Sequence, residues 1–385
     1  MSNRTDPLNI WLVDPVNYSG MAYYDAGLAG GLADAGANVT LVGSDRPLVS
    51  PTPRERLVFK SGFSGTAPNR AKWRRALSYG ISVTRLARAL QQVRPDWLLW
   101  NYVEQPTLDG FAIRRARARG AKIGFIAHET EPWEGDASRR RIYQWLVEEA
   151  ADAVIVHGET NAEIVRRTWD VEDGRIIVSE HGDYREWVRP ATNRATSRSR
   201  LALPKDAPIA LLFGTLRMSK GLKTLLAAWP IVRRALPSAE LLIAGRPYRG
   251  TDLASLGELG PGVTLHAHEI PAGIANDYYA ACDVVAIPYE KVSTSGVLRY
   301  AYSACRPVVA TRTGELRTHV LQGETGWLVP SGDRQATADA LIAALIDRTH
   351  SHQLGVAARG YAQATFDWTA ITERLLADLR KWYPQ

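Results

Sequence analysis

The sequence of 385 residues has only two cysteines, Cys282 and Cys305, and no run of 18 apolar residues. Two cysteines do not make a disulfide framework, and a chain without a long apolar run does not cross a membrane as a helix. The N-terminal residues MSNRTDPLN are polar and lack the apolar segment of a secretory leader. We therefore expect a protein of the reducing cytosol. The length exceeds what one ordinary core needs, so it predicts two domains.

Acidic residues are scarce in one stretch of the chain. Residues 51–122 carry 15 Lys and Arg against four Asp and Glu, whereas residues 1–190 as a whole are nearly balanced, at 25 against 24. Trp73, Tyr79 and Phe63 lie among these cations. The combination suits an anionic membrane surface or a phosphate-bearing acceptor, and a solvated arginine-rich face is the alternative. No nucleic-acid-binding module matches the sequence, so we expect no nucleic-acid partner.

Short apolar runs alternate with segments of helical periodicity in both halves of the chain. Near-continuous apolar strands between amphipathic helices predict parallel sheets with helices on both faces. The sequence therefore predicts two doubly wound α/β domains, joined by a linker over residues 185–208 that is rich in Pro, Ser, Thr and Arg. The predicted strands are 10–15, 38–43, 97–102, 122–129, 153–158 and 175–182 in the first half, and 209–214, 240–245, 263–269, 284–289, one within 293–315, and 326–330 in the second.

Two loops of the second half have the composition of an anion site. In FGTLRMSKGLKTLLAAW (213–229), Arg217 and Lys220 lie between a strand and a helix, where a helix N-terminus and two cations can neutralise a diphosphate. In STSG (293–296), small and hydroxyl-bearing residues lead into another helix, which suits close approach of an anion to backbone N–H groups. The alternatives are a pair of solvated cations and an ordinary helix cap.

The sequence resembles the retaining glycosyltransferases of the GT4 family, which have the GT-B fold. The resemblance covers nearly the whole chain and rests on the segments YSGMAYYDAGLAGGLADAG, GFIAHETEPWEG, DAVIVHGETNAEIVRR, VSEHGDY, FGTLRMSKGLKTLL and STSGVLRYAYSACRPVVATRTGELRTHVLQGETGWLVPSGD. It implies an N-terminal Rossmann-like acceptor domain over 1–190, a C-terminal nucleotide-sugar domain over 191–365, and a helix over 366–385 that crosses back to the first domain. The two domains would face an interdomain cleft.

The resemblance also implies roles for individual residues. Arg217 and Lys220 would bind the diphosphate of the donor and stabilise it as the leaving group, and His128 would lie beside the donor sugar. The remaining donor-binding candidates are Gly20, Gly214, Ser293, Thr294, Ser295, Gly296, Val297 and Ile270. Tyr18 and Ser19, beside Gly20, are acceptor candidates. The acidic segment HETEPWEGD after His128 adds Glu129, Glu131, Trp133 and Glu134 to the acceptor candidates, although an acidic run before a helix is an alternative interpretation.

The chain departs from the family at one motif. Most members carry Glu-x7-Glu around the STSG loop, and the spacing places Val292 and Tyr300 at those two positions. Neither side chain accepts a charge-assisted hydrogen bond. The S-G-V-L turn is typical of a subset of the family. Glu290, two residues before Val292, is a candidate replacement, and an ordinary loop carboxylate is the alternative.

No acidic metal-binding motif occurs in the expected loop, so we expect no metal and no other cofactor. His157, His181, His266, His268 and His319 are interpreted as structural, because they lack metal-ligand spacing.

Together these features predict a retaining, metal-independent glycosyltransferase that uses a UDP- or GDP-sugar and a lipid-linked or polysaccharide acceptor. It would be cytoplasmic and peripheral on the inner face of a membrane, with residues 51–122 toward the lipid. Three alternatives remain open: a non-catalytic binding subunit, a transferase acting on a soluble small molecule, and a nucleotide-sugar epimerase.

Overall fold

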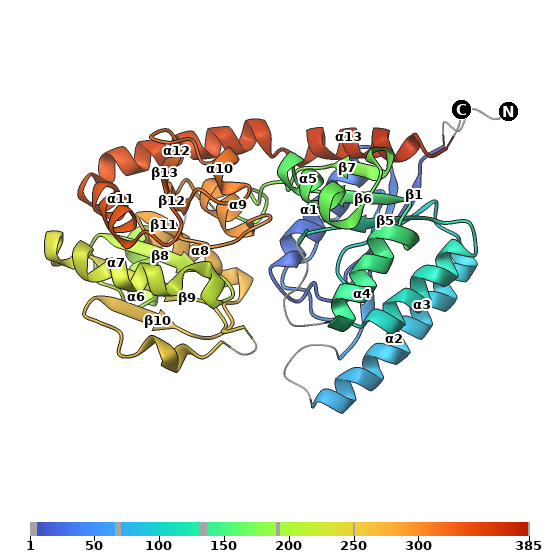
Figure 1. Cartoon of the computed structure of the whole chain (residues 1–385), viewed down its shortest axis with the longest axis horizontal. Coiled ribbons are helices and arrows are strands. Elements are labelled where there is room, and N and C mark those ends of the chain that lie inside the picture. The colour runs from blue at the N-terminus through green and yellow to red at the C-terminus, as the bar shows by residue number, and fades with distance from the viewer. Residues whose placement is uncertain (1–5, 66–70, 131–136, 190–192, 249–250, 384–385) are drawn as a thin grey trace. The chain divides into compact units, whose positions relative to one another are not determined.

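A computed structural model describes residues 6–65, 71–130, 137–189, 193–248 and 251–383. The chain divides into two compact units (Figure 1). Unit 1 consists of residues 1–182 together with 367–385, and unit 2 consists of residues 183–366. None of the described helices has the length and apolar character needed to cross a membrane.

Unit 1 contains a seven-stranded sheet in the order β3-β2-β1-β4-β5-β6-β7, and all of its paired strands are parallel. The order reverses between β1 and β4, as in doubly wound sheets. The strands are β1 (Asn9–Val13), β2 (Asn38–Ser44), β3 (Leu57–Phe63), β4 (Trp97–Trp100), β5 (Lys122–Ile126), β6 (Ala153–Val156) and β7 (Ile176–Val178). The helices are α1 (Met21–Asp34), α2 (Lys72–Val93), α3 (Pro106–Arg117), α4 (Ala137–Trp145), the π-helix η1 (Leu146–Ala150), α5 (Glu159–Trp169), the 3-10 turn η2 (Asp173–Arg175) and α13 (Trp368–Arg380).

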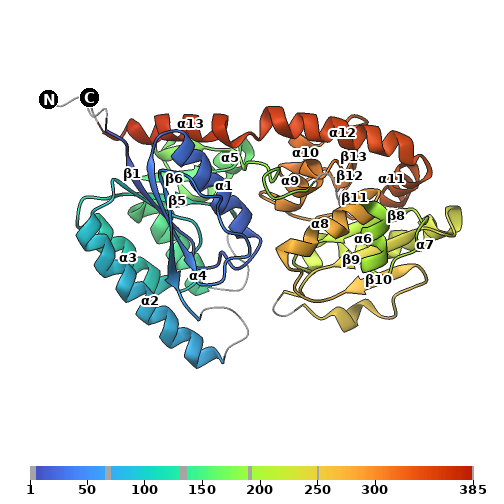
Figure 2. The same ribbon diagram turned by 180° about the vertical axis from the view of Figure 1, so that it is seen from behind.

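Helices cover both faces of this sheet (Figures 1 and 2), and an apolar core lies on each face. Helices α2, α3, α4 and α5 contribute to one core and α1 and α13 to the other. Alternate residues of each strand enter opposite cores: in β4, Leu98 and Trp100 face the first, and Trp97 and Leu99 face the second. This alternation explains why the strands appear in the sequence as continuous apolar runs.

Unit 2 contains a six-stranded parallel sheet in the order β10-β9-β8-β11-β12-β13, with its reversal between β8 and β11. Helices α7 and α11 cover one face through a common core, and α8 and α9 contact β8 and β11 (Figure 2). The strands are β8 (Ile209–Phe213), β9 (Glu240–Ala244), β10 (Val263–His266), β11 (Val284–Ile287), β12 (Val308–Thr311) and β13 (Gly326–Val329). The helices are α6 (Arg194–Arg200), η3 (Met218–Lys220), α7 (Leu222–Ala235), η4 (Leu253–Leu256), α8 (Ala272–Ala281), α9 (Gly296–Ser303), α10 (Leu316–His319), α11 (Arg334–Ile346) and α12 (Arg348–Thr365).

The segment predicted as a linker, 185–208, contains helix α6 instead. Asn193 caps this helix by accepting a hydrogen bond from Thr196 N. Arg198 is buried and bonds to the carbonyl oxygen of Ala281 at 2.9 Å. The linker prediction was wrong because an arginine-rich composition was taken as solvated, whereas these arginines have partners inside unit 2.

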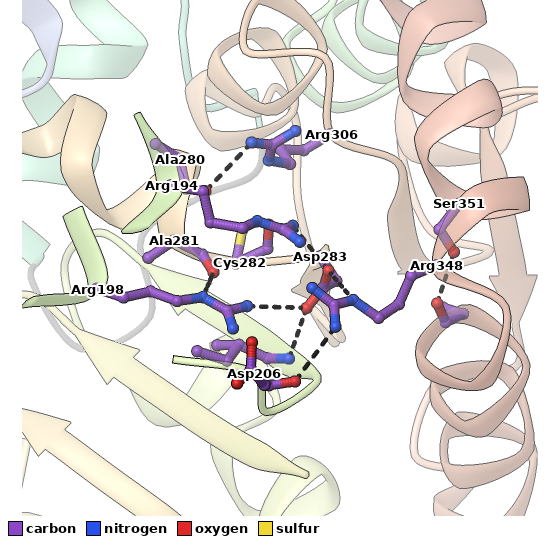
Figure 3. Close-up of polar contacts among 12 residues, drawn as sticks. Arg194, Arg198, Asp206, Ala280, Ala281, Cys282, Asp283, Arg306, Arg348 and Ser351 are labelled. Atoms are coloured by element: carbon purple, nitrogen blue, oxygen red, sulfur yellow. Dashed lines mark hydrogen bonds and ion pairs between the residues drawn. The ribbon is translucent and has the colours of Figure 1, made fainter. Parts of the chain in front are cut away.

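Those partners meet at Asp283, at the start of β11 (Figure 3). The buried Asp283 carboxylate pairs with Arg194 at 2.7 Å, with Arg198 at 3.3 Å and with Arg348 at 2.9 Å, and it also accepts a hydrogen bond from Ile209 N at 2.8 Å. A buried carboxylate requires such partners. The Asp283 cluster thus connects α6, β8, β11 and α12 at the amino ends of the strands.

Candidate functional site

The two predicted anion-binding loops lie at the carboxyl ends of β8 and β11, which are neighbours across the strand-order reversal of unit 2. Ligands of doubly wound sheets bind at this point, because the loops diverge there and leave room. The loop after β8 contains Gly214, Arg217 and η3, and ends at Gly221 before α7. The loop after β11 runs to Ser295, the N-cap of α9.

Three of the predicted residues are close together. A Cβ atom added to Gly214 would lie 3.3 Å from Lys220 Nζ and 3.4 Å from Val297 Cγ2. Gly214 has a φ of +98°, in the left-handed region that favours glycine. The glycine turn, the lysine and the first turn of α9 therefore meet at one place, with no side chain on Gly214 to fill the space between them.

Aromatic rings surround the two cations. The Arg217 guanidinium lies 4.0 Å from the centre of the Tyr248 ring, and Lys220 Nζ lies 5.1 Å from the centre of the Tyr289 ring. Burial, together with the neighbouring Arg217 charge, lowers the pKa of Lys220 to about 7. An anion bound here would restore the positive charge of Lys220, because an opposite charge favours the protonated form.

The Ser-Thr-Ser-Gly loop is stabilised by the cap that Ser295 forms on helix α9. Ser295 Oγ accepts a hydrogen bond from Leu298 N at 3.3 Å, which makes Ser295 the N-cap of α9. The Thr294 hydroxyl is buried and has no hydrogen-bond partner within the described part of the chain. The N–H groups of Gly296 and Val297 lie in the first turn of α9, where a helix has no internal acceptors for them.

Glu315 and Arg299 are part of this loop's support, and the sequence interpretation missed both. Glu315 accepts a hydrogen bond from Ser295 N, and its second oxygen pairs with Arg299 Nη2 at 2.7 Å. Both side chains are buried, and the Arg299 guanidinium stacks 3.7 Å from the centre of the Phe366 ring. The glutamate lies in the segment TRTGE that carried the resemblance, but nothing in its spacing pointed back to Ser295.

The remaining donor-side candidates, Glu290 and Ile270, differ in burial. The Glu290 side chain is exposed, and its backbone N donates to the Ser219 carbonyl oxygen at 2.9 Å, which ties the β11 loop to η3. Ile270 is largely buried just before α8. Tyr300, which occupies the second Glu-x7-Glu position, is buried and stacks on Tyr279 with ring centres 4.2 Å apart.

In unit 1, His128 follows β5, and both of its ring nitrogens have partners. Nε2 lies 2.5 Å from the Asn101 side-chain oxygen, and Nδ1 lies 2.9 Å from His157 Nε2. Burial, with His157 and His181 nearby, holds the pKa of His128 well below its ordinary value. Asn101 and His157 were not predicted as site residues, although each lies near the end of a predicted strand.

The candidates after β1, Tyr18 and Ser19 for the acceptor and Gly20 for the donor, lie at the start of α1. Gly20 is the N-cap residue, Ser19 Oγ accepts a hydrogen bond from Met21 N at 3.3 Å, and Tyr18 is half-buried beside them. Glu129 is half-buried, and its carbonyl oxygen accepts a hydrogen bond from the Tyr143 hydroxyl. Glu131, Trp133 and Glu134 lie outside the described residues. Among the residues that the structure describes, no three His, Cys, Asp or Glu side chains are grouped to hold a metal ion.

Comparison with known proteins extends to both units. A family model described as "Glycosyltransferase Family 4" matches residues 18–182, and one described as "Glycosyl transferases group 1" matches residues 207–347. A D-inositol 3-phosphate glycosyltransferase of Corynebacterium diphtheriae is 30% identical over 260 residues, which are 65% of this chain and 60% of the relative. The chain thus spans about 60% of the length of the curated relatives it matches.

Solved structures share the fold along almost the entire chain. Sucrose-phosphate synthase from Thermosynechococcus elongatus superposes with a TM-score of 0.73 at 24% identity, covering 97% of this chain and 98% of that one. HepE from Anabaena, solved in complex with UDP-glucose, has a TM-score of 0.73 at 15% identity, covering 97% and 100%. The predicted GT-B fold is confirmed, with a doubly wound parallel sheet in each unit. With one family model on each unit and this fold throughout, the chain belongs to the GT4 family of glycosyltransferases.

Proposed function

We propose that the protein transfers a sugar from a UDP-sugar to an acceptor hydroxyl group, with retention of configuration and without a metal ion. The observation that carries the donor part is the meeting of Gly214, Lys220 and Val297 at the switch point of unit 2. Arg217 lies in the same loop. Two cations and a helix N-terminus at one strand end are suited to a diphosphate. UDP-glucose bound to HepE supports uridine as the base.

The proposed reaction breaks the bond between the anomeric carbon and the diphosphate oxygen, and the electron pair leaves with the diphosphate. The acceptor oxygen bonds to the anomeric carbon on the same face, and its proton passes to an oxygen of the leaving phosphate. Arg217, Lys220 and the N–H groups of Gly296 and Val297 stabilise the negative charge that develops there. Ser295 contributes through its cap, because its N–H is already bound to Glu315.

A thermal-shift screen tests the donor site directly. UDP, GDP, ADP and dTDP, and their glucose conjugates, are added without metal to the wild type, to Lys220→Ala and to Lys223→Ala. Lys223 is exposed in the first turn of α7, so its substitution removes the same charge three residues away. A ligand at 100 times its Kd adds about 2.7 kcal/mol to the free energy of unfolding.

We expect UDP and UDP-glucose to stabilise the wild type and Lys223→Ala but not Lys220→Ala. If GDP alone stabilises, the base is guanine and the phosphate site stands. If no nucleotide shifts the wild type, the donor proposal fails and a non-catalytic role becomes the better explanation.

For the acceptor, we propose a lipid-linked molecule at an anionic membrane surface, reached by the exposed face of α2. Trp73, Leu77 and Ile81 are 65%, 60% and 46% exposed, and their four-residue spacing aligns them along one side of the helix. Arg85 and Arg88 are exposed on the same helix. Apolar side chains beside arginines match the interface of a bilayer that contains acidic lipids.

Co-sedimentation with vesicles tests this surface. The triple variant Trp73→Ser, Leu77→Ser, Ile81→Ser is compared with Ile346→Ser, which removes one of the most exposed apolar side chains of unit 2. We expect the wild type and the control to bind vesicles with phosphatidylglycerol and not vesicles of phosphatidylcholine alone, and the triple variant to lose binding. Equal binding by the triple variant would exclude α2 as the membrane contact.

A soluble acceptor is the second candidate, and the curated relatives support it. Their name, D-inositol 3-phosphate glycosyltransferase, describes transfer to a small phosphorylated polyol. Sugar transfer from UDP-glucose to inositol phosphate in the absence of lipid, with no vesicle binding, would favour this candidate. Transfer only to a lipid extract would favour the first.

A further inference from the structure

Five neighbouring strands of unit 1 end in polar groups that hydrogen-bond to one another in a single row. Asp14 follows β1, Asn101 follows β4, His128 follows β5, His157 follows β6 and Ser179 follows β7. This is also the order of these strands across the sheet. The proposed donor chemistry needs only one member of the row, His128, so the other groups require an explanation.

The histidine end of the row fixes the position of one proton. His157 Nδ1 lies 3.0 Å from the carbonyl oxygen of Ser179, which can only accept, so this nitrogen carries hydrogen. His157 Nε2 lies 2.9 Å from His128 Nδ1, and one proton lies between them. The number of protons on the two rings then depends on whether the Asn101 side chain places its oxygen or its nitrogen at His128 Nε2.

The carboxylate end of the row lies on the other side of Asn101. The Asn101 amide nitrogen faces two carboxylates, contacting Asp25 of α1 and lying 3.3 Å from Asp14 Oδ2. Asp14 and Asp25 are fully buried, and Asn101 is 1% exposed. Two ionised carboxylates at such close range in a buried site repel each other strongly.

Counting protons gives two arrangements of the row. With the Asn101 oxygen toward His128, the two histidines must hold three protons, so one ring is a cation, and the amide nitrogen donates to the two carboxyl groups. With the amide turned over, its nitrogen donates to His128 Nε2, and the histidines hold two protons and are both neutral. The Asn101 oxygen then faces Asp25, which must be protonated to donate to it.

The second arrangement needs no cation in the row, whereas the first places an imidazolium there. Isolated charges in such surroundings are costly, which favours the second arrangement. Burial raises the pKa of Asp14 to about 6, and burial with the neighbouring Asp14 holds the pKa of Asp25 well above its ordinary value. The direction for His128 agrees, since its pKa is held low.

The groups that surround the row favour the same arrangement. Glu104, beyond β4, adds negative charge near Asp14. The Tyr24 ring of α1 packs edge-on against His128, His157 and His181, at centre distances of 4.7, 5.1 and 4.9 Å. Tyr24 and the other two imidazoles carry no negative charge that would stabilise a cation on His128.

We propose that Asp25 holds one proton, that Asn101 turns its amide nitrogen toward His128, and that this keeps His128 neutral with its hydrogen on Nδ1. Asp25 and Asn101 are then positioning residues, which act through His128. This inference rests on the proposed function for its purpose: positive charge develops on the sugar during transfer, and a cationic His128 beside it would oppose that charge.

The test is a 15N spectrum of the histidine rings, which distinguishes both neutral tautomers from the cation. Protein labelled at histidine is recorded between pH 6 and pH 8, and the signals are assigned with His128→Gln and His157→Gln. We expect His128 and His157 to be neutral and protonated at Nδ1. An imidazolium at either position at pH 7 overturns the proposal. The 15N spectrum requires neither a bound donor nor enzyme activity.

Two substitutions should have different effects on the protonation of His128. Asp25→Asn keeps a donor toward Asn101 and should leave the His128 tautomer unchanged. Asn101→Asp places a carboxylate at His128 Nε2, and should convert His128 to the cation and slow transfer by about tenfold or more. A neutral His128 in Asn101→Asp, or a cation in Asp25→Asn, contradicts the proposal. If no donor is turned over at all, the proposed function fails while the spectra still decide this inference.

Discussion

Glu315 accepts a hydrogen bond from the backbone N–H of Ser295, twenty residues earlier in the chain. The contact joins the N-cap of α10 to the N-cap of α9. Arg299, one turn into α9, holds the second oxygen of the same carboxylate at 2.7 Å. The proposed phosphate loop is therefore positioned by a buried ion pair behind it.

Removal of this carboxylate should be costly. We expect Glu315→Ala to lower the free energy of unfolding by about 3–5 kcal/mol, because it leaves Arg299 buried without its counter-ion. The control is Glu180→Ala, which removes the partner of the exposed Arg374 and should cost about 1 kcal/mol or less. Urea unfolding measures both values, and similar losses in the two variants would show that the Arg299 pair does not support the fold.

Gly221 should be intolerant of a side chain. An added Cβ would lie 1.8 Å from the Pro288 carbonyl oxygen, and the residue has a φ of +72°. Gly323 has a similar φ of +75°, but no atom lies within 4 Å of its added Cβ. Gly323→Ala should therefore cost only the backbone strain, about 1–2 kcal/mol.

We expect Gly221→Ala to be clearly less stable than Gly323→Ala in urea, and to lose the thermal shift with UDP, because η3 and Lys220 must move. The matched pair separates collision from backbone strain. Equal stability of the two variants would mean that the Pro288 backbone moves away from the added Cβ atom with no loss of stability.

Donor binding should take up a proton at Lys220. The pKa of this lysine is lowered to about 7, so at pH 8 the free protein is mostly neutral there. A bound diphosphate raises the pKa, so binding at pH 8 takes up nearly one proton, and binding at pH 6 takes up little. Calorimetric titration with UDP-glucose in buffers of different ionisation enthalpy measures this uptake.

Lys220→Arg is the control for proton uptake, because the guanidinium remains charged at both pH values. Its binding heat should not depend on the buffer. A wild-type heat that is the same in all buffers at pH 8 would mean that Lys220 is already charged before the donor arrives.

Asp109 should make stability depend on pH in a defined direction. Burial raises its pKa to about 7, although Tyr79 and the N–H groups of Glu104 and Gln105 donate to it. The folded state keeps this proton where the unfolded state loses it, so the stabilisation is complete below about pH 4 and is lost as the pH rises to 7.

We expect Asp109→Asn to remove this dependence, so that the variant gains on the wild type as the pH rises from 4.5 to 7. Urea unfolding at several pH values measures the difference. A constant difference between the two proteins across this range would contradict the raised pKa.

The sequence predicted the fold well where strands are buried on both faces. Strands such as β4 and β6 are wholly buried and appear in the sequence as continuous apolar runs. Strand β3 was missed because it lies at the edge of the sheet, where Lys60 and most of its other side chains are at least partly exposed. Helix α12 was also missed. Its Gly355 weakens the helical signal, and it is needed because a Cβ there would lie 2.2 Å from the Cys305 carbonyl oxygen.

Local motifs could indicate the candidate site only in part. Arg217, Lys220 and the STSG turn stand at strand ends and could be found from composition. Glu315 could not, since its partner Ser295 is brought to it by the crossing of β12 beside β11. The hydrogen-bond partners of His128, Asn101 and His157, come from two other segments, so their connection depends on strand order, which the sequence does not state.

The Asp283 cluster has a consequence for exchanging parts between related chains. Arg194 and Arg198 come from the segment before β8, whereas Asp283 and Arg348 come from much later in unit 2. A recombination junction placed at residue 208 would separate the carboxylate from two of its three arginines. A junction at residue 183, where unit 2 begins, would transfer Asp283 together with all three of its arginines.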